Sequence, residues 1–584
     1  MKAKRSHMKP PTNPPPYSCS NTTNSDINNK TGNSTITTNI NNNNSTTTIR
    51  SSSNTNNNNN NNYGYDYDYD KYSSSSSSHS HLLPPKNIEK KIKSGVFKIA
   101  VYGLGHIGAP LASVWLRQGA HVIGVDKSSK VLENAKIGKT HLLLEPGVNE
   151  AFTKGIEDNR FEVYEDLVKA SLDSYFKMIC VPVLLLDTAA NGSSGSSGGG
   201  GAAAAAMTTT TAAAAAADLT AIKDVAASIG KGLKKFDVVS LNPSVPPGTT
   251  EEVVIPILEK ESGGLKAETD FFVIYSPERI YEGRAIEDIE NRYPAIISGA
   301  GARSVDIAAK IYSIIFKKGV ISMSNIRTAE TEKLLEGVYR DVNIALANEF
   351  AKFCEKVGGE GGGVDFWEAR DAANSQPFCH IHKPGVGVGG ACIPVYPQFI
   401  LHTADKIKAN CSITRMSRSI NDSMPAYCVE RAIELLLLVE GKEKGKEKQE
   451  KQKGKEEEEA EEAIIIITLL GLAFRGGVSD TRLSPTYKVI EEFQKRVKVK
   501  EIRIHDPFVI NDPSLLSGKY NNIILTSNLN EAIQGTDLVM LITDHPEYRT
   551  LTADDLGGAP VYDGRAMLDR SKFNHSAFAS IGIG

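Results

Sequence analysis

The stretch from Phe97 to Asp126, FKIAVYGLGHIGAPLASVWLRQGAHVIGVD, combines two strand-like runs, a glycine-rich turn and a helical segment. The run FKIAVYG is short, rich in β-formers and nearly continuous in apolar residues, which is typical of a strand buried on both faces of a parallel sheet. It leads directly into GLGHIG (103–108), which matches GxGxxG, and the following PLASVWLRQG is helical in character. Asp126 ends the next strand. This order predicts a Rossmann-like βαβ unit.

The glycine-rich turn is the first candidate site. Its glycines allow backbone amides to approach a pyrophosphate at the helix N-terminus, and the acid ending the second strand can accept hydrogen bonds from a ribose diol. An ordinary glycine turn is the alternative, but strand, helix and acid together favour a dinucleotide site. The acid favours NAD over NADP because it would repel a 2′-phosphate. The predicted contacts to NAD are Gly103, Gly105, His106, Ile107, Gly108 and Asp126.

Further strand-like apolar runs lie on both sides of one long helical segment. Residues 326–357 have the helical pattern. β-rich runs precede it at MICVPV, DVVSLN and FFVIYS, and others follow residue 463 at IIIITLLGL, EIRIHD, NIILTS, DLVMLIT and APVYDG. We therefore predict an α/β fold in which two doubly wound Rossmann-like domains are joined by a long central helical connector.

Composition divides the chain further. Residues 1–95 are dominated by Asn, Ser and Thr, cannot bury enough apolar surface to fold, and are predicted to form a disordered tail. We expect a NAD-binding domain over 96–325 with a low-complexity insertion at 191–217, a central helical domain over 326–432, and a C-terminal domain over 433–584. The Lys/Glu-rich insertion at 441–462 is either a partner-binding tail or, as we favour, a solvated linker or exposed helix. The glycine run at 358–363 is interpreted as an enlarged loop.

Overall charge and cysteine usage restrict the class of protein. The 584 residues carry a formal net charge of -3, so no global charge attracts nucleic acid or an anionic membrane. The seven cysteines form no CxxC pair, which fits reduced thiols better than a disulfide framework. The N-terminus has no apolar signal region, and the stretch AIIIITLLGLAF (463–474) is too short to span a bilayer. We expect a cytoplasmic protein in which this stretch is a buried strand.

One cysteine stands in an unusual loop. In KPGVGVGGACIPVYP (383–397), Cys392 follows glycines at alternate positions and precedes a proline. By itself it is either a nucleophile or a small buried hydrophobe, and free cysteines are usually the latter. If it is a nucleophile, the glycines, Gly389 among them, would let backbone amides and a ligand approach the sulfur closely.

Two other segments place polar groups just beyond strand ends. In SVPPGTTEEV (244–253) we interpret Thr249 and Thr250 as caps of the next helix and keep Ser244 as a candidate site residue. In YSPERIYEGRAIED (275–288), Glu278 and Glu282 lie about one helical turn apart. These carboxylates are either acid/base groups or ion-pair partners of the neighbouring arginines.

Six motifs, taken in order, resemble the nucleotide-sugar dehydrogenase family, also called the UDP-glucose/GDP-mannose dehydrogenase family. They are GLGHIG, SVPPGTTEEV, YSPERIYEGRA, AETEKLLEGVYRDVNIALANE, PGVGVGGACIPV and LGLAFRGGVSDTRLSP, and the similarity covers about 97–570. The form SPERIYEGRA resembles the branch of UDP-N-acetyl-D-mannosamine dehydrogenases more than the UDP-glucose branch. The resemblance implies NAD-dependent four-electron oxidation of the C6 hydroxyl of a UDP-sugar, a UDP-N-acetylhexosamine, to the uronate, in a homodimer or higher oligomer.

The resemblance also implies roles for individual residues. Cys392 would trap the aldehyde as a thiohemiacetal and then carry a thioester, while Lys333 stabilises oxyanions. Glu278 matches an acid/base group, and Ser244 stands where the family commonly has a Thr that positions a water. The implied substrate contacts are Glu278, Glu282, Lys333, Gly389, Phe474, Arg475 and Arg565, and the implied additional cofactor contacts are Ser244, Glu282 and Arg482.

Three positions depart from the family pattern. Gly337 stands where many members have Asn, Tyr396 where many have Asp, and Phe378 where an Arg is expected. A tyrosine cannot act as a carboxylate at neutral pH. Because of these departures, a second interpretation stays open: the protein is a catalytically impaired homologue that binds NAD and a nucleotide sugar. A UDP-glucose 6-dehydrogenase also stays open, as does a two-electron NAD dehydrogenase of the 6-phosphogluconate or 2-hydroxyacid kind, which has no use for Cys392.

Overall fold

The computed structural model describes residues 88–142, 145–186, 214–357, 363–450, 464–574 and 577–583, with side chains omitted from 442–450. Most of the predicted tail and of the two insertions, and nearly all of the glycine run at 358–363, lie outside the described residues. The end of the predicted tail is an exception. Helix α1 (Ile88–Lys93) buries Ile88 and Ile92 in the N-terminal core, so these residues belong to the folded domain.

The N-terminal sheet has eight strands in the order β10-β9-β8-β7-β4-β1-β2-β3. All neighbouring strands are parallel except β8 and β9. Since β1 pairs with both β2 and β4, the strand order reverses there, and ligands of such sheets bind beyond the carboxyl ends of these strands. The strands are β1 (Ile99–Tyr102), β2 (Val122–Val125), β3 (Phe161–Tyr164), β4 (Phe176–Ile179), β7 (Val238–Leu241), β8 (Phe272–Tyr275), β9 (Ala295–Gly299) and β10 (Val320–Ser322).

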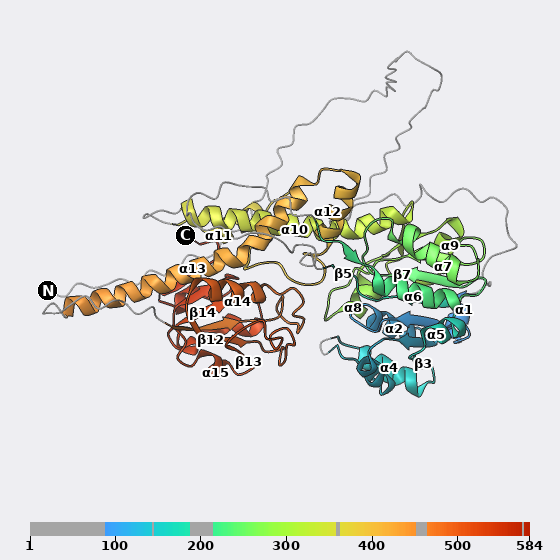
Figure 1. The fold of residues 1–584 in the computed structure, drawn as a ribbon, viewed down its shortest axis with the longest axis horizontal. Coiled ribbons are helices and arrows are strands. Elements are labelled where there is room, and N and C mark those ends of the chain that lie inside the picture. The colour runs from blue at the N-terminus through green and yellow to red at the C-terminus, as the bar shows by residue number, and fades with distance from the viewer. Residues whose placement is uncertain are drawn as a thin grey trace, which may run out of the picture. The chain divides into compact units, whose positions relative to one another are not determined.

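Helices cover both faces of this sheet (Figure 1), which explains why its central strands β1, β4, β7 and β8 are buried along their whole length. In β1, Ile99 and Val101 belong to one buried core and Ala100 and Tyr102 to the other. The first core includes α2 (Gly108–Arg117), α4 (Val148–Glu157) and α9 (Ala302–Tyr312). The second includes α5 (Leu167–Asp173), α6 (Thr220–Lys231) and α7 (Ile255–Glu261).

The C-terminal sheet has six strands in the order β13-β12-β11-β14-β15-β16, all parallel. Its order reverses between β11 and β14, as in the first sheet. The predicted buried strand in AIIIITLLGLAF is β11. The strands are β11 (Ile465–Leu470), β12 (Val499–His505), β13 (Ile523–Thr526), β14 (Leu538–Leu541), β15 (Val561–Asp563) and β16 (Phe578–Ser580), with helices α14 (Pro485–Arg496) and α15 (Leu529–Ile533) between them.

The central region consists of α10 (Ile326–Val357), α11 (Phe366–Ala373), α12 (Tyr396–Ile407) and α13 (Ser412–Glu450). Helices α10 and α13 pack together through a buried polar group in which Arg418 and Asn421 of α13 both contact the carboxylate of Asp341. Helix α13 continues without a break past Ala432, so the domain boundary predicted there falls inside a helix. The predicted fold class is confirmed: two doubly wound α/β domains are joined by long central helices.

A small two-stranded ribbon lies outside the two main sheets, and the short helices α3 (Ser129–Lys136) and α8 (Ala285–Glu287) lie in the N-terminal domain. Strands β5 (Leu184–Leu185) and β6 (Ala217–Asp218) form an antiparallel ribbon that joins the two sides of the insertion predicted at 191–217. Among the helices in the described ranges, none is both long enough and apolar enough to cross a membrane.

Candidate active site

The glycine-rich turn lies at the carboxyl end of β1 and opens α2. Gly103 has φ +97°, a conformation that strains any residue with a side chain, and a Cβ on Gly108 would lie 1.8 Å from the Gly103 oxygen. A Cβ on Gly105 would meet nothing within 4 Å, so the turn is open on that side. Asp126 follows β2 and accepts the Leu104 amide at 2.9 Å. The open turn and the adjacent acid fit the diphosphate and ribose of NAD.

The Ser-Pro-Pro segment after β7 is held by a carboxylate from α10. Glu330 is fully buried and accepts hydrogen bonds from the amides of Gly248 and Thr250 at 2.5 and 2.8 Å, and from the Thr250 hydroxyl at 2.7 Å. The prediction that Thr249 and Thr250 cap the next helix is therefore wrong. The Thr249 hydroxyl donates back to the Pro246 carbonyl, and Glu330 satisfies the amides that a cap would have satisfied.

The segment that carries Glu278 and Glu282 is not helical, contrary to the predicted spacing along a helical turn. It is a loop beyond β8, and its end is held by the Glu145 carboxylate, which accepts hydrogen bonds from the amides of Gly283 and Ala285 at 2.9 and 2.7 Å. The loop places the two glutamates in different surroundings. Glu278 is 5% exposed, whereas Glu282 is partly accessible and lies beside the glycine-rich turn.

Glu278 is a buried carboxyl group with a cation nearby. Burial raises its pKa to about 7, while the Lys333 ammonium and a hydrogen bond from Asn242 act in the opposite direction. The Asn242 amide nitrogen lies 3.4 Å from Oε1 of Glu278. Lys333, on α10, is only 6% exposed and forms an ion pair with Glu336 at 3.2 Å. The pair Glu278–Lys333 combines a proton acceptor that titrates near neutral pH with a fixed positive charge.

Cys392 is exposed and lies just before α12. The glycines before it contact the C-terminal domain closely. A Cβ on Gly389 would lie 2.7 Å from the Leu483 carbonyl oxygen, and one on Gly390 would lie 2.9 Å from the Phe474 ring. The Gly390 amide also donates to the Arg482 carbonyl at 2.9 Å. The glycines therefore allow the cysteine loop to contact the chain that carries Phe474 and Arg482, a reason not foreseen from the sequence.

Tyr396 connects the cysteine loop with the Ser-Pro-Pro segment. Its hydroxyl accepts a hydrogen bond from Oγ of Ser244 at 2.8 Å, and its amide donates to the Cys392 carbonyl at 2.9 Å. The Lys333 ammonium lies 6.0 Å from the centre of its ring. Ser244, Lys333 and Cys392, which are far apart in the sequence, are thus gathered around one buried phenol.

A second group of site residues lies between the two α/β domains. Nε2 of His106 is 3.6 Å from Oε1 of Glu282, and Asp480 of the C-terminal domain lies within 4.8 Å of both. Arg482 donates to both oxygens of Asp480 at 2.5–2.9 Å. Burial, and then Asp480, raise the pKa of Glu282 to about 7. Burial, and then Arg482, lower the pKa of His106 to about 4, so this imidazole is neutral at physiological pH.

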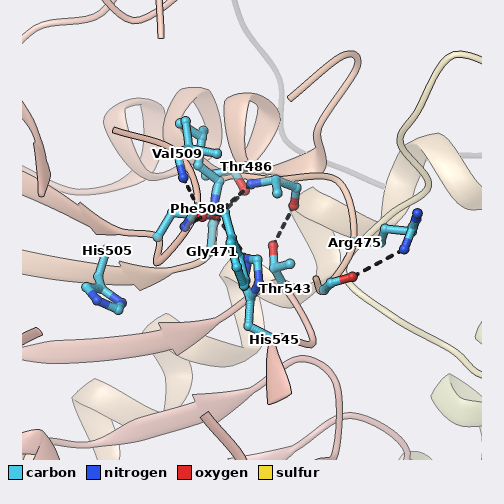
Figure 2. Close-up of polar contacts among 12 residues, drawn as sticks. Gly471, Arg475, Thr486, His505, Phe508, Val509, Thr543 and His545 are labelled. Carbon is cyan, nitrogen blue, oxygen red and sulfur yellow. Dashed lines mark hydrogen bonds and ion pairs between the residues drawn. The ribbon is translucent and has the colours of Figure 1, made fainter. Parts of the chain in front are cut away.

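Arg475 and Phe474 come from a tight loop after β11. The Thr486 and Thr543 hydroxyls hold this loop by donating to the carbonyls of Gly471 and Ala473 (Figure 2). Arg475 extends out of it: its guanidinium donates to the Glu282 carbonyl at 2.9 Å and lies 3.9 Å from the centre of the Tyr281 ring.

Beneath this loop lies a buried carboxylate that the sequence did not reveal. Asp506 accepts the amides of Leu472 and Ala473 at 2.7 and 2.9 Å and pairs with His545 at 3.1 Å. Figure 2 shows His545 close under the loop. The first domain has the same arrangement, in which Asp126 accepts the Leu104 amide.

Arg565, a predicted substrate contact, lies at the site, whereas Phe378, one of the three departures from the family pattern, lies on the surface. Arg565 pairs with Asp544 at 3.1 Å, and a Cβ on Gly385 would lie 2.6 Å from its guanidinium, so it borders the cysteine loop. Burial would raise the pKa of Asp544, but Arg565 and the Gly476 amide bring it to about 2. Phe378, which replaces the expected Arg, is 96% exposed.

Sequence reasoning missed three residues that hold the site together: Asn242, Glu145 and Glu330. Asn242 ends the DVVSLN run, where polar side chains reach the ligand edge of a parallel sheet, so its position was a usable signal. Glu145 and Glu330 carry no such signal. Glu145 lies in a loop, and Glu330 stands at an ordinary polar position of a helical pattern. Only folding brings these carboxylates to the backbone amides whose hydrogen bonds they accept.

Comparisons with known proteins agree with this geometry. Family models match the NAD binding domain over residues 97–191 and 202–316, the central domain over 327–423 and the UDP binding domain over 468–570. The chain belongs to the UDP-glucose/GDP-mannose dehydrogenase family. The suspected resemblance is confirmed, and the protein is an NAD-dependent nucleotide-sugar dehydrogenase.

Several similar members of this dehydrogenase family have names that refer to N-acetylated sugars. The UDP-N-acetyl-D-mannosamine dehydrogenase of Pyrococcus horikoshii is 32% identical over 475 residues, 81% of this chain and 96% of the relative. An NDP-N-acetyl-D-galactosaminuronic acid dehydrogenase of Ralstonia solanacearum is 28% identical over 82% of this chain and 98% of its own length. The solved structure of the Pyrococcus horikoshii UDP-D-ManNAc dehydrogenase superposes with a TM-score of 0.67 at 29% identity, covering 83% of this chain and 99% of that one.

Proposed function

We propose that this dehydrogenase oxidises the C6 hydroxyl of a UDP-N-acetylhexosamine, such as UDP-N-acetylmannosamine, to the uronate, with Cys392 as the nucleophile. The observation that carries the proposal is the gathering of Ser244, Lys333 and Cys392 around Tyr396. Glu278 lies close enough to Lys333 for the ammonium to act against burial, which raises the pKa of its carboxyl group. The similarity to enzymes named for N-acetylated sugars and the motif SPERIYEGRA support the substrate class.

The chain's own residues supply binding and covalent chemistry. NAD, when bound at the glycine-rich turn, would accept one hydride in each of the two oxidations. In the first, the C6 hydroxyl also loses its proton to solvent, which leaves the aldehyde. The Cys392 thiolate attacks C6 of the aldehyde, forming a C–S bond while the carbonyl π electrons become an oxyanion that Lys333 stabilises. Loss of the C6 hydride from this thiohemiacetal leaves a thioester. Glu278, with its pKa near 7, takes a proton from the attacking water, and Cys392 leaves as the thiolate.

The other predicted residues have positions suited to binding. Asp126 would hold a ribose diol and Arg482 would approach the pyrophosphate of NAD. Glu282, beside both His106 and Arg475, would contact substrate and cofactor. Phe474, Arg475 and Arg565 would contact the nucleotide sugar, since arginine forks suit the two oxygens of a phosphate.

A substrate panel with product stoichiometry tests this proposal. Purified protein with NAD should convert a UDP-N-acetylhexosamine to the uronate with close to two NADH per sugar, more efficiently than UDP-glucose. A ratio of one would support a two-electron dehydrogenase, and binding of NAD and sugar without NADH would support an impaired homologue. Cys392→Ala should abolish uronate formation. Undiminished turnover in that variant would refute the nucleophile.

We also propose that the protein is at least a homodimer built on α10. This helix leaves apolar side chains uncovered at positions three, four or seven apart, which is the spacing of a helix packing seam. They are Leu335, Tyr339, Leu346, Phe350, Phe353 and Val357. Light scattering should give a mass of at least twice 63.1 kDa, and a monomer would contradict the proposal.

We further propose a cytoplasmic location. The six described cysteines are all free, which supports this location because reduced thiols persist there.

A further inference from the structure

Asp544 lies at the ligand edge of the C-terminal sheet, just beyond the carboxyl end of β14. This strand pairs with β11 where the strand order reverses, and ligands of such sheets bind beyond the strand ends at that point. The two neighbours of Asp544, Thr543 and His545, are buried and both hydrogen-bond to the loop that follows β11 (Figure 2). Asp544 is only partly buried, so its carboxylate stands at the open side of the same loop.

Gly476 links Asp544 to Arg475. Its amide donates to Oδ1 of Asp544 at 2.9 Å, and its carbonyl accepts a hydrogen bond from Nη1 of Arg475 at 3.3 Å. A Cβ on Gly476 would lie 2.1 Å from the Asp544 carbonyl oxygen, so a residue with a side chain could not come this close. Asp544 therefore fixes the backbone from which Arg475 extends.

The second oxygen of Asp544 holds the guanidinium of Arg565. Oδ2 of the carboxylate lies 3.1 Å from Nη2 of the arginine. The other terminal nitrogen, Nη1, faces the start of the cysteine loop, where a Cβ on Gly385 would lie 2.6 Å from it. The two oxygens of one carboxylate thus hold two different segments, and each segment carries an arginine of the site.

We propose that Asp544 is a positioning residue for the nucleotide sugar: it holds Arg475 and Arg565 so that both bind the diphosphate of one substrate molecule. The inference rests on the proposed function, in which these two arginines contact the nucleotide sugar. Arginine forks bind phosphate oxygens in a fixed geometry, and a long side chain that is already held in place loses less conformational entropy on binding. Asp544 acts through the arginines.

The charge of Asp544 distinguishes positioning from a simple electrostatic effect. Burial would raise the pKa of this carboxyl group, but Arg565 and the Gly476 amide bring it to about 2, so the group is an anion at neutral pH. An anion near a bound diphosphate repels it, and removal of the charge would by itself strengthen binding. Loss of positioning has the opposite sign, because the ligand must then order the freed arginines.

Calorimetric titration of the full-length protein with UDP, and separately with NAD, tests the proposal without turnover. Asp544→Ala should raise the Kd for UDP about tenfold or more and leave the Kd for NAD unchanged. Asp544→Asn keeps an acceptor for the Gly476 amide but loses the charge that holds Arg565, so it should recover part of the loss. In steady-state assays, KM for the nucleotide sugar should rise by a larger factor than kcat falls. Asp554→Ala, at an exposed carboxylate of the same domain, should change neither Kd.

Unchanged or tighter binding of UDP by Asp544→Ala would overturn the inference and leave the proposed function intact, because uronate formation by the wild type tests that function separately. If Asp544→Ala lost NAD binding as well, Asp544→Asn would decide. Weaker UDP binding with normal NAD binding in the asparagine variant supports positioning, whereas unchanged UDP binding, or loss of both ligands, overturns it. A wild-type protein that bound NAD but no UDP would refute the proposed function together with the inference.

Discussion

The ring of Tyr396 on α12 occupies the space that a side chain at Gly337 of α10 would need, since a Cβ on the glycine would lie 2.4 Å from the ring. Gly337→Ala should therefore destabilise the protein although alanine is the better helix former. Overpacking a buried site costs about 1–3 kcal/mol, which outweighs the gain of about 1 kcal/mol from helix propensity. Chemical denaturation should show a lower free energy of unfolding, and turnover should fall with it because the displaced ring carries the hydroxyl that contacts Ser244.

Gly441 provides the matched control for this substitution. It is an exposed helical glycine in α13, and a Cβ there would meet nothing within 4 Å. Gly441→Ala should be neutral or stabilise the protein by up to about 1 kcal/mol. Equal effects of the two substitutions would mean that Tyr396 does not fill the space beside Gly337.

Glu278 should make stability depend on pH. Burial raises its pKa from 4.5 to about 7, so the folded state favours the neutral carboxyl group. The stabilisation is complete below pH 4.5 and is lost as the pH rises through 7. Over this range Glu278 should lower the free energy of unfolding by roughly 3 kcal/mol, from 1.36 kcal/mol per pH unit. Glu278→Gln cannot ionise and should lose this dependence.

The comparison for Glu278 uses unfolding curves at pH 5 and pH 8. The difference in stability between wild type and Glu278→Gln should change between these two values in favour of the variant at pH 8. Glu349→Gln, on an exposed position of α10, should follow the wild type at both. A constant difference between wild type and Glu278→Gln would show that Glu278 is ionised in both conditions.

Glu330 should be essential for the conformation of the Ser-Pro-Pro segment, because it accepts hydrogen bonds from that segment's backbone amides. Glu330→Ala leaves the amides of Gly248 and Thr250 without their acceptor in a buried place, which should cost roughly 2–4 kcal/mol. Because Ser244 lies four residues before Gly248, kcat should fall as well. Thermal unfolding and steady-state kinetics measure both effects. Thr331→Ala, on the next position of α10, should change stability by less than about 0.5 kcal/mol, and a similar loss there would remove the special role of Glu330.

The sequence was sufficient for features that depend on local patterns. Continuous apolar runs identified β1, β7 and β11, and GLGHIG with Asp126 predicted the glycine-rich turn that opens α2 beside an acid, because a parallel sheet and its first crossover leave a regular signature. The short strands β10 and β16 have only three residues each and carry no such pattern.

The predictions that were wrong concern features that depend on contacts between segments distant in the sequence. The threonines at 249 and 250 match a helix cap locally, but Glu330 from α10 reaches the same amides. Glu278 and Glu282 have helical spacing, yet their segment is a non-helical loop, and Glu145 accepts hydrogen bonds from the Gly283 and Ala285 amides that follow it. The link between Gly337 and Tyr396 is likewise invisible until α10 and α12 are packed together.

Arg475 should determine affinity for the nucleotide sugar more than the rate of chemistry. Its guanidinium is fixed between the Glu282 carbonyl and the Tyr281 ring, so it presents its remaining donors in a defined direction. Arg475→Ala should raise KM for the sugar about tenfold or more, with a smaller effect on KM for NAD. Arg475→Lys should recover part of the loss, since lysine keeps the charge but not the fork. Arg496→Ala, on the exposed end of α14, should leave both constants unchanged, and equal increases in the two KM values for Arg475→Ala would refute the assignment.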